Sequence, residues 1–590
     1  MQTTAQHFLG LALDFLKVLA FFAAIVLPTT WVCFRRLTGQ SIIARLALGT
    51  ASGFSIFVVA AWYIGLWSLN GLIWFWLAQM ILATWFGRVS GPSDVTSDSD
   101  LDAARTRTRT SSLVLLPLCA GVLVQLYAMH FASLPPGVDS SFHCVVGQRQ
   151  LDAGRATMDL WPLEELRLNY PIGSHLWLAV AAQWTGLEIH EVFKHSFTLA
   201  LCGAALCVGA WSERVFGSAA HAVMGAFAFV FGSFQSSLFP FTWGGLPSAL
   251  AMWQGLAALF CVLHVEGRAG WLIAAPLFAA TAMTHHHTMV AFLGGVGVVA
   301  VVRMLLNRGL GRGSQRVLSS LLAATALAGV YLVPLVDRVG ELKQTGTLDF
   351  CEPFSWPWEH LWSGGPGLVV TSGLGMFTAY QASARQSRWF LLNLAIFWLA
   401  SFLLLDYAGR WLGSWWQNKA VTPFTPSRFL FDLQFVLAVF AGGGLMRLWH
   451  WFARPAFRYA LIVAIGCWAI WQTEPRWEPN SSDLLIPVGR WVRVELPKDA
   501  LVTGLESIWV TYVCHRESTS LFIPISEPTA LPRARIKEAL RRAPWMLPGG
   551  EWSERLHKPI YAIGSAQDES WGNQPVFVSG PLGVFRVTPE

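Results

Sequence analysis

The stretch that decides the fold runs from Leu46 to Leu66 and reads LALGTASGFSIFVVAAWYIGL, without a charged residue. A helix rises about 1.5 Å per residue, so a run of this length crosses the roughly 30 Å hydrocarbon core of a bilayer. Apolar blocks of the same kind recur along the 590-residue chain. The sequence therefore predicts an all-α polytopic membrane protein.

The composition of the whole chain supports this prediction. Hydrophobic residues make up 54% of the sequence and charged residues only 13%, whereas soluble globular domains carry about 25% charged residues. These figures exclude an ordinary soluble enzyme, a disordered chain and a coiled coil. The net charge of +6 does not indicate a nucleic-acid partner, because the basic residues are scattered through short loops.

The apolar blocks predict about fourteen spans. They lie near residues 8–33, 46–66, 69–87, 112–133, 193–211, 219–237, 246–265, 270–284, 288–302, 317–335, 366–380, 389–405, 429–446 and 457–473. The first block lacks a basic n-region and a small-residue cleavage site, so we interpret it as a retained helix rather than a signal peptide.

Lysine and arginine sort the loops onto two sides of the membrane. One set of loops holds most of the basic residues, for example Arg303, Arg308 and Arg312, and the positive-inside rule places this set in the cytoplasm. The loop at 134–192 then lies outside. Block 171–188 within it is accordingly interpreted as a helix that lies in, or dips into, the outer leaflet. The alternative is an ordinary span next to a miscounted helix.

Composition divides the chain into three parts. Residues 1–111 carry the first three blocks and a cytoplasmic linker rich in Ser, Thr, Asp and Arg, and residues 112–473 carry the other blocks. Residues 474–590 are polar and combine a helical pattern with short alternating runs, such as Ile508–Val513 and Pro575–Val578. This last part is predicted to be a small α/β domain outside the membrane.

The nine cysteines include no CxxC pair. Most of them lie within the predicted spans, where Cys acts as a small apolar residue. Cys144, Cys351 and Cys514 fall in segments predicted to lie outside, and the sequence leaves any disulfide among them unassigned.

The segment after the fourth block reads LPPGVDSSFH over residues 134–143. Asp139 follows a Pro-Pro-Gly turn at the start of an expected helix, and His143 comes four residues later, on the same face. A carboxylate beside an imidazole, at the mouth of a membrane cavity, is suited to removing a proton from a hydroxyl group. The alternative is that Asp139 caps the N-terminus of the helix.

This segment resembles the first external loop of the GT-C superfamily, which comprises polytopic glycosyltransferases that use lipid-linked sugar donors. The shared features are an Asp just outside a span, a Phe-His pair, an amphipathic helix and a Tyr-Pro stretch at Tyr170. Residues 243–248 (WGGLPS), 284–288 (THHHT) and 426–429 (PSRF) are similar to further elements of such proteins. The resemblance covers most of residues 112–590. It implies a GT-C-like helical bundle, to which the first three spans are an addition.

The resemblance implies that Asp139 is the catalytic base, which deprotonates an acceptor hydroxyl. That hydroxyl attacks the donor sugar with inversion at its anomeric carbon, and polyprenyl phosphate leaves. The leaving phosphate then needs cations. Arg428 is the first choice, because its planar guanidinium binds two phosphate oxygens at once, and Lys419 and Arg410 share its loop. The alternative for Arg428 is an anchor among the lipid headgroups.

Three consecutive histidines, His285, His286 and His287, do not fit a single metal ion on a regular helix, because adjacent residues point about 100° apart. We expect one or two of them to bind donor phosphate or sugar hydroxyls. The alternative is a polar helix cap at the membrane interface.

Four further residues are expected to contact the acceptor or the sugar, namely Glu164, Glu165, Tyr170 and Trp243. For the two glutamates, the alternative is that they simply face water. Metal-dependent members of the superfamily show an Asp-x-Asp or Glu-x-Asp motif where this chain has Val138-Asp139-Ser140-Ser141. The sequence therefore does not predict a required divalent metal, and no metal ligand is assigned.

The sequence favours a membrane glycosyltransferase. It would transfer a sugar from a polyprenyl-phosphate donor to a cell-envelope glycan, lipid or protein acceptor at the outer face of a bacterial inner membrane. One alternative is a transporter or flippase of lipid-linked glycans, but such proteins tend to carry inverted repeats and charges at the bilayer midplane. Here no repeat is found, and the ionisable candidates gather at one face. A second alternative is a non-catalytic scaffold of the same fold in envelope assembly.

Overall fold

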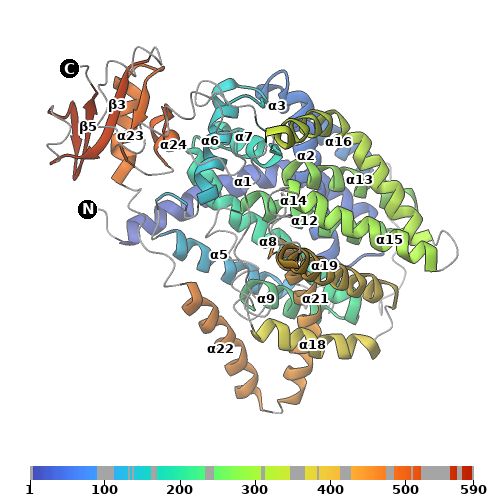
Figure 1. Cartoon of the computed structure of the whole chain (residues 1–590). Coiled ribbons are helices and arrows are strands. Elements are labelled where there is room, and N and C mark those ends of the chain that lie inside the picture. The colour runs from blue at the N-terminus through green and yellow to red at the C-terminus, as the bar shows by residue number, and fades with distance from the viewer. Residues whose placement is uncertain are drawn as a thin grey trace.

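The protein is a helical body with a small β-sheet at one end, as the computed structural model shows (Figure 1). The structure describes residues 4–88, 112–130, 133–135, 138–160, 168, 170–232, 245–306, 312–345, 366–381, 385–411, 427–452, 454–473, 484–505, 509–519, 558–567 and 574–587.

Each apolar block that was predicted as a span forms a helix. These helices are α1 (Thr4–Arg36), α2 (Ile42–Gly65), α3 (Leu72–Arg88), α5 (Leu115–Met129), α8 (Ile189–Phe216), α9 (Ala219–Phe231), α12 (Leu246–His264), α13 (Gly267–Thr284), α15 (Gly294–Leu306) with the preceding π-helical turn η2 (Met289–Leu293), α16 (Arg312–Thr345), α18 (Pro366–Gln381), α19 (Arg385–Trp411), α21 (Ser427–Trp451) and α22 (Pro455–Thr473). Within the described residues, six helices are long and apolar enough to cross a membrane. The prediction of a polytopic helical membrane protein is confirmed.

Block 171–188 forms the short helix α7 (Gly173–Thr185), whose 13 residues span about 20 Å at 1.5 Å per residue. Its start lies beside the turn that follows α13, because a Cβ on Gly173 would touch the carbonyl oxygen of Met283. At its other end, Gln183 donates a hydrogen bond to Asn70, in the turn between α2 and α3. Both turns lie on the side predicted to be outside. Helix α7 therefore does not cross the body, which favours the interpretation as an outer-leaflet helix.

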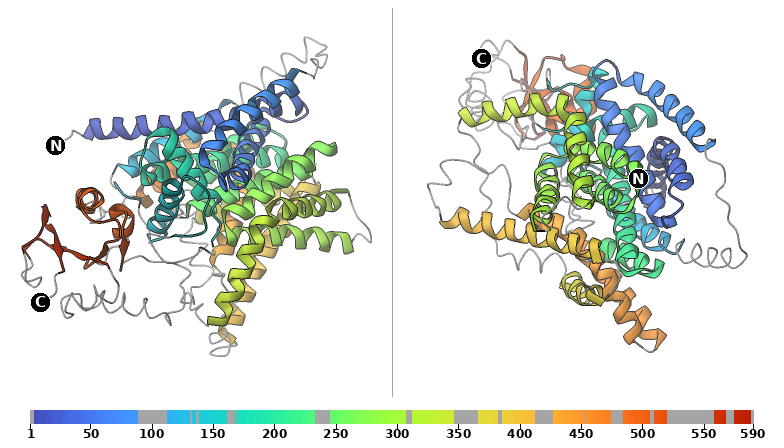
Figure 2. Two further views of the ribbon diagram at one scale, coloured as in Figure 1. Left: turned by 90° about the horizontal axis from the view of Figure 1, so that it is seen from above. Right: turned by 90° about the vertical axis from the view of Figure 1, so that its right-hand side faces the viewer.

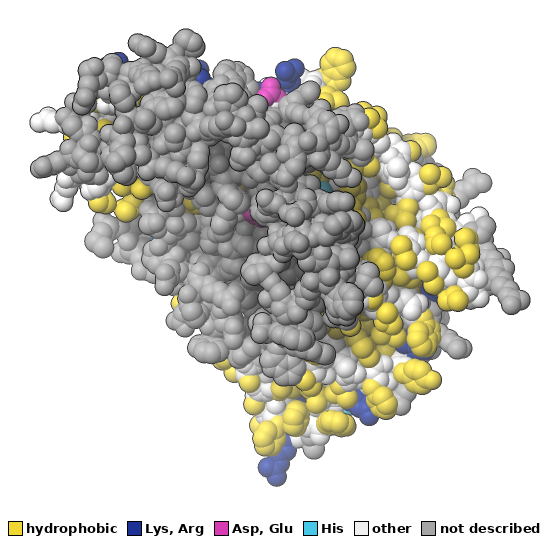
Figure 3. Space-filling view, in the orientation of Figure 1, with side chains coloured by type: hydrophobic (Ala, Val, Ile, Leu, Met, Phe, Trp, Pro, Cys, Tyr) yellow, Lys and Arg dark blue, Asp and Glu magenta, His cyan; other side chains and the backbone are white. Residues whose placement is uncertain are grey.

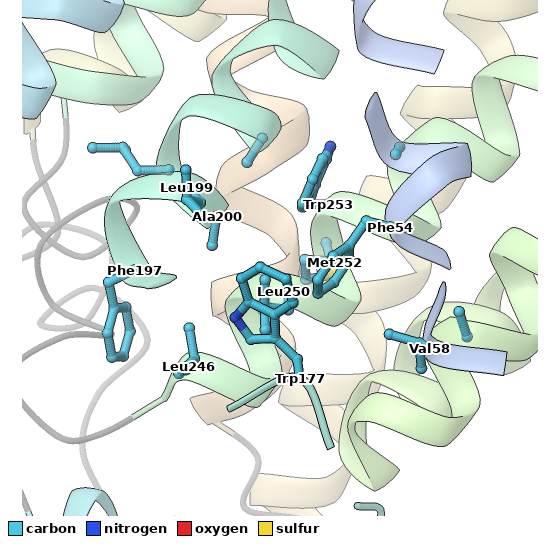
Figure 4. Close-up of a cluster of buried hydrophobic side chains, with 14 of the residues drawn as sticks. Phe54, Val58, Trp177, Phe197, Leu199, Ala200, Leu246, Leu250, Met252 and Trp253 are labelled. Atoms are coloured by element: carbon cyan, nitrogen blue, oxygen red, sulfur yellow. The ribbon is translucent and has the colours of Figure 1, made fainter. Parts of the chain in front are cut away.

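The core lies where α2, α7, α8 and α12 meet (Figure 4). The ring of Phe54 stacks on Trp253 at 5.4 Å and meets Trp177 edge-on at 5.3 Å, and the Trp177 indole donates a 2.8 Å hydrogen bond to Ser196. Aromatic pairs of this kind contribute about 0.5–1.5 kcal/mol each beyond their buried area. This packing fixes α7 against the body and thereby places the residues at its start.

The N-terminal helices belong to the same packed body. Helix α2 contacts α8, α12 and α13, and the turn after α2 bonds to the chain that follows α6 (Val138–Ala153). The backbone amide of Ala156 donates to the carbonyl of Gly65 at 2.6 Å, and that of Leu69 donates to Gly154 at 2.8 Å. The boundary predicted after residue 111 lies outside the described residues, so this division of the chain stays a prediction.

Large hydrophobic side chains cover much of the outer surface of the helical body. Figure 3 shows them as a broad band over the right-hand and lower parts of the molecule, with basic side chains at the lower edge. Leu306 and Leu322 are 77% and 75% exposed, and Trp74 is 73% exposed. Soluble monomers rarely expose contiguous apolar surface of this extent. This band is the surface that hydrocarbon would cover.

The C-terminal part forms the predicted small α/β domain, which stands at one end of the body (Figure 2). Its elements are α23 (Leu485–Glu495), β1 (Leu501–Thr503), α24 (Val510–Cys514), β2 (Glu517–Ser518), β3 (Ile560–Ser565), β4 (Phe577–Ser579) and β5 (Leu582–Arg586). The strand order is β2-β1-β3-β5-β4, in which β1 runs parallel to β2 and β3, and β5 runs antiparallel to β3 and β4.

One predicted strand in this domain is wrong. The run Pro575–Val578 contributes to β4, but Ile508–Val513 does not form a strand, because Val510–Cys514 forms the one-turn helix α24. All five residues of α24 are buried. A segment that is buried on every side shows no useful polar alternation, so its periodicity cannot separate a strand from a helix. The thiols of Cys144 and Cys514 are free, and Cys351 lies outside the described residues.

The burial of His515 predicts that the stability of the C-terminal domain depends on pH. It ends α24 at φ 46°, and burial, assisted by the charges of Arg493 and Arg516, lowers the pKa of its imidazole to about 3. An unfolded chain protonates this group near pH 6.5, whereas the folded chain keeps it neutral. The stabilisation is therefore complete above about pH 6.5 and is lost as the pH falls toward 3, by about 2 kcal/mol at pH 5.

The substitution His515→Asn tests this prediction, because Asn does not titrate and tolerates a positive φ. We expect the unfolding temperature of the detergent-solubilised chain to fall between pH 8 and pH 5, and to fall less in His515→Asn than in the wild type. Equal falls in both proteins would show that another group carries the pH dependence.

Candidate active site

Asp139 lies in the first turn of α6, directly after Val138, and is half-buried. This position is inside the helix, one residue past its start, so Asp139 does not occupy the N-cap position that the alternative interpretation gave it. A carboxylate in the first turn faces the positive end of the helix macrodipole, which stabilises its charged form. The helix thus presents a carboxyl group near the start of the outer loop.

His143, one turn along α6, is paired with a second buried histidine. Its Nδ1 atom lies 2.9 Å from Nε2 of His175 in α7, and the two side chains are only 3% and 0% exposed. Burial lowers the pKa of His175 to about 3, so this ring is neutral at physiological pH. The contact between the two ring nitrogens fixes the orientation of the His143 ring, one helical turn after Asp139.

The ring of Tyr170 lies at the centre of this group. Its centroid is 5.4 Å from His143, 5.8 Å from His175 and 4.9 Å from His286. Helix α6, the segment before α7 and the turn after α13 thereby converge on one cluster, which we call the His–Tyr cluster and define as His143, Tyr170, His175 and His286. Its ring nitrogens and phenol are groups that form hydrogen bonds with hydroxyl groups.

The three consecutive histidines lie at a break between helices. His285 is extended, at φ −151° and ψ 122°, between α13 and the short helix α14 (His286–Thr288). Its Nδ1 atom accepts a 3.2 Å hydrogen bond from the backbone amide of Thr288, so the helix-cap interpretation holds for His285. His286 joins the His–Tyr cluster, and His287 is buried. Phosphate or sugar binding by these residues stays a prediction.

Among the residues that the structure describes, no three His, Cys, Asp or Glu side chains are grouped so as to hold a metal ion. The three consecutive histidines are themselves described, and two of them make different contacts. His285 turns back to cap α14, while His286 lies against Tyr170. Both rings face Tyr170, His286 at 4.9 Å and His285 at 6.2 Å between ring centroids.

The remaining predicted site residues are placed in part or not at all. Arg410 lies at the end of α19 and Arg428 near the start of α21, so both backbones stand at the helix ends that residues 412–426 connect. Their side chains are not described. Lys419, Glu164, Glu165 and Trp243 lie outside the described residues.

Two residues of this region had no predicted role. His175 pairs with His143, and its sequence signal was an imidazole within an otherwise apolar run. Lys194 of α8 is only 4% exposed and donates a 2.8 Å hydrogen bond to the carbonyl of Ser133, at the base of the loop that leads to Asp139. A lysine inside an apolar span is costly to bury without a partner, which was the available signal.

Comparison with solved structures identifies the fold. The structure of ArnT from Cupriavidus metallidurans bound to undecaprenyl phosphate superposes on this chain with a TM-score of 0.54 at 12% identity. The match covers 80% of this chain and 98% of that chain. Its apo form gives a TM-score of 0.52 at 12% identity, over 80% and 97%. The chain has the GT-C fold.

The GT-C fold was predicted from short motifs, and the structural comparison confirms it. The oligosaccharyltransferase of Archaeoglobus fulgidus tethered to an acceptor peptide is also similar, with a TM-score of 0.46 at 13% identity, over 77% of this chain and 69% of that chain. No protein-family model and no curated protein matches the sequence. At 12% identity, the likeness to the two ArnT structures establishes the fold alone and not the activity of this chain.

Proposed function

We propose that this protein is a membrane glycosyltransferase that moves a sugar from a polyprenyl-phosphate donor to a hydroxyl-bearing acceptor. The observation that carries the proposal is the half-buried Asp139 in the first turn of α6, one helical turn before a histidine whose ring is held by His175. A carboxylate at the edge of an apolar helical body, beside hydrogen-bonding rings, provides a base and a binding surface for sugar hydroxyls. The GT-C fold supports the same chemistry.

The proposed reaction is a single inverting displacement. Asp139 takes the proton of the acceptor hydroxyl as the acceptor oxygen forms a bond to the anomeric carbon of the donor sugar. The bond between that carbon and the phosphate oxygen breaks, and polyprenyl phosphate leaves with the bonding electron pair. Arg428, Lys419 and Arg410 are proposed to stabilise the charge on the leaving phosphate, because guanidinium and ammonium groups bind phosphate oxygens strongly.

The acceptor is proposed to be a glycan, lipid or protein of the cell envelope, reached from the outer face of a bacterial inner membrane. The distribution of basic residues supports this sidedness, because Asp139 and the C-terminal domain fall on the side opposite the basic loops. His285, His286 and His287 are proposed to bind donor phosphate or sugar hydroxyls, and Tyr170 of the His–Tyr cluster is proposed to contact the acceptor or the sugar. Glu164, Glu165 and Trp243 remain proposed acceptor contacts.

A transfer assay with the purified full chain in liposomes tests the proposal. The donor is a polyprenyl-phosphate sugar labelled in the sugar, and the acceptor is an envelope fraction. We expect the label to appear in the acceptor while polyprenyl phosphate is released in equal amount. A transporter would instead move the intact donor across the bilayer, so intact donor on the opposite side without released polyprenyl phosphate would contradict the proposal.

A further inference from the structure

The C-terminal domain is joined to the start of α8 by a buried tyrosine. Tyr512 of α24 is 2% exposed, and its hydroxyl oxygen accepts a 3.0 Å hydrogen bond from the backbone amide of His190. The same hydroxyl lies 3.1 Å from Nδ1 of His190. A free amide in the first turn of a helix needs a partner, and here the partner comes from a residue that is 322 positions away.

Charged groups reinforce this contact at the same place. Glu188 precedes α8, and its backbone amide donates to the Glu191 carboxylate in a capping box. The guanidinium of Arg493 in α23 lies 3.9 Å from the Glu188 carboxylate and donates a 2.7 Å hydrogen bond to the carbonyl of Val513. Arg493 is 22% exposed, whereas Arg490, at the same distance from Glu188, is 70% exposed. Solvent screens the Arg490 pair much more strongly.

The first two turns of α8 also hold the loop that carries the candidate base. Lys194 donates to the carbonyl of Ser133 at 2.8 Å, just before the chain enters α6. On α6 itself, the thiol of Cys144 is fully buried. It lies within electrostatic reach of Lys194 and of Tyr512, and α24 packs directly against α6.

We propose that the C-terminal domain is a positioning domain for the active site. Tyr512 and Arg493 act as positioning residues, because they fix the start of α8 and the back of α6, and through these the location of Asp139 and His143. Misplacement of a catalytic group by about 1 Å can lower a rate by about 100-fold. The statement about catalysis rests on the proposed function, whereas the docking of the domain does not.

The burial of Cys144 on α6, the helix against which α24 packs, gives a direct test of docking. The full chain, with Cys144 as its only cysteine, is treated in native membranes with a membrane-impermeant maleimide applied from the outer side. We expect slow labelling in the parent, and labelling about tenfold faster in Tyr512→Phe and Arg493→Met, since each substitution removes two of the hydrogen bonds that hold this contact. Labelling after denaturation shows that the thiol is intact.

Two matched variants control for side-chain chemistry. Tyr561→Phe removes a tyrosine hydroxyl from β3 of the same domain, and Arg490→Met removes the exposed arginine beside Glu188; both should label at the parental rate. Arg493→Lys should restore part of the protection. Unchanged labelling in both Tyr512→Phe and Arg493→Met would overturn the docking role.

Kinetics separate positioning from simple stability. In the transfer assay, Tyr512→Phe is expected to lower kcat about tenfold with an unchanged KM for the donor, since the base is displaced but the donor site remains. Faster labelling with an unchanged kcat would overturn the positioning role. If the parent chain has no transfer activity, the proposed function and the positioning role are both overturned. If the variants of that chain still label faster at Cys144, the docking of the C-terminal domain stands.

Discussion

Asp139→Asn is expected to lower the rate of sugar transfer by about 1,000-fold, within the range that removal of a general base produces. Asparagine keeps the size of the side chain in the first turn of α6, but its amide does not accept a proton from the acceptor hydroxyl. The KM for the donor should change little, because the proposed donor contacts are other residues. Initial rates with a labelled polyprenyl-phosphate sugar measure the effect.

The matched control is Asp159→Asn, because Asp159 is an exposed aspartate in the same outer loop and should transfer at the parental rate. Asp139→Glu keeps a carboxylate but moves it by one methylene, so it should recover part of the lost activity. Full activity in Asp139→Asn would contradict the proposed role of Asp139 as the general base. It would mean that another group takes the proton of the acceptor hydroxyl, whereas a parent chain without any transfer activity would favour the non-catalytic scaffold.

The helical body could be predicted because a bilayer leaves few choices. Backbone groups in hydrocarbon must bond within their own segment, so an uncharged apolar run forms a helix wherever it occurs. The run Leu46–Leu66 meets this condition and lies within α2 apart from its last residue. Val510–Cys514 lies in a folded domain, where burial on every side favours neither a strand nor a helix. For this segment the sequence pattern predicted a strand, and the structure has a helix.

The candidate site could be predicted only where it is local. Asp139 and His143 are one turn apart on one helix, so their shared face follows from the spacing alone. The pairing of His143 with His175 joins residues 32 positions apart. It depends on how Trp177 and Gly173 pack α7 against the body. The hydrogen bond that the His190 amide donates to Tyr512 likewise depends on the docking of the C-terminal domain. A single sequence carries no signal for such packing.

The second large effect concerns the crossing of α18 and α21, the helix on which Arg428 lies. Their backbones approach so closely that a Cβ added at Gly375 would overlap the carbonyl oxygen of Phe440, and a Cβ at Gly444 would overlap that of Thr371. The hydroxyl of Ser372 donates a 2.7 Å hydrogen bond to the carbonyl of Leu437 across the same crossing. Small residues allow such close contact between membrane helices, where packing rather than the hydrophobic effect drives association.

Gly375→Ala is therefore expected to destabilise the protein by about 3 kcal/mol, at the upper end of the usual cost of overpacking, because the clash is with backbone. Gly373→Ala is the matched control, since a Cβ there meets nothing within 4 Å. On helix propensity alone, both substitutions should stabilise α18 by about 1 kcal/mol. Thermal unfolding of the detergent-solubilised chain should thus separate two identical substitutions on one helix, with Gly375→Ala below the parent and Gly373→Ala at or above it. Equal unfolding temperatures would mean that α18 and α21 do not pack this closely. The start of α21, and with it the backbone of Arg428, would then be held in place by other contacts.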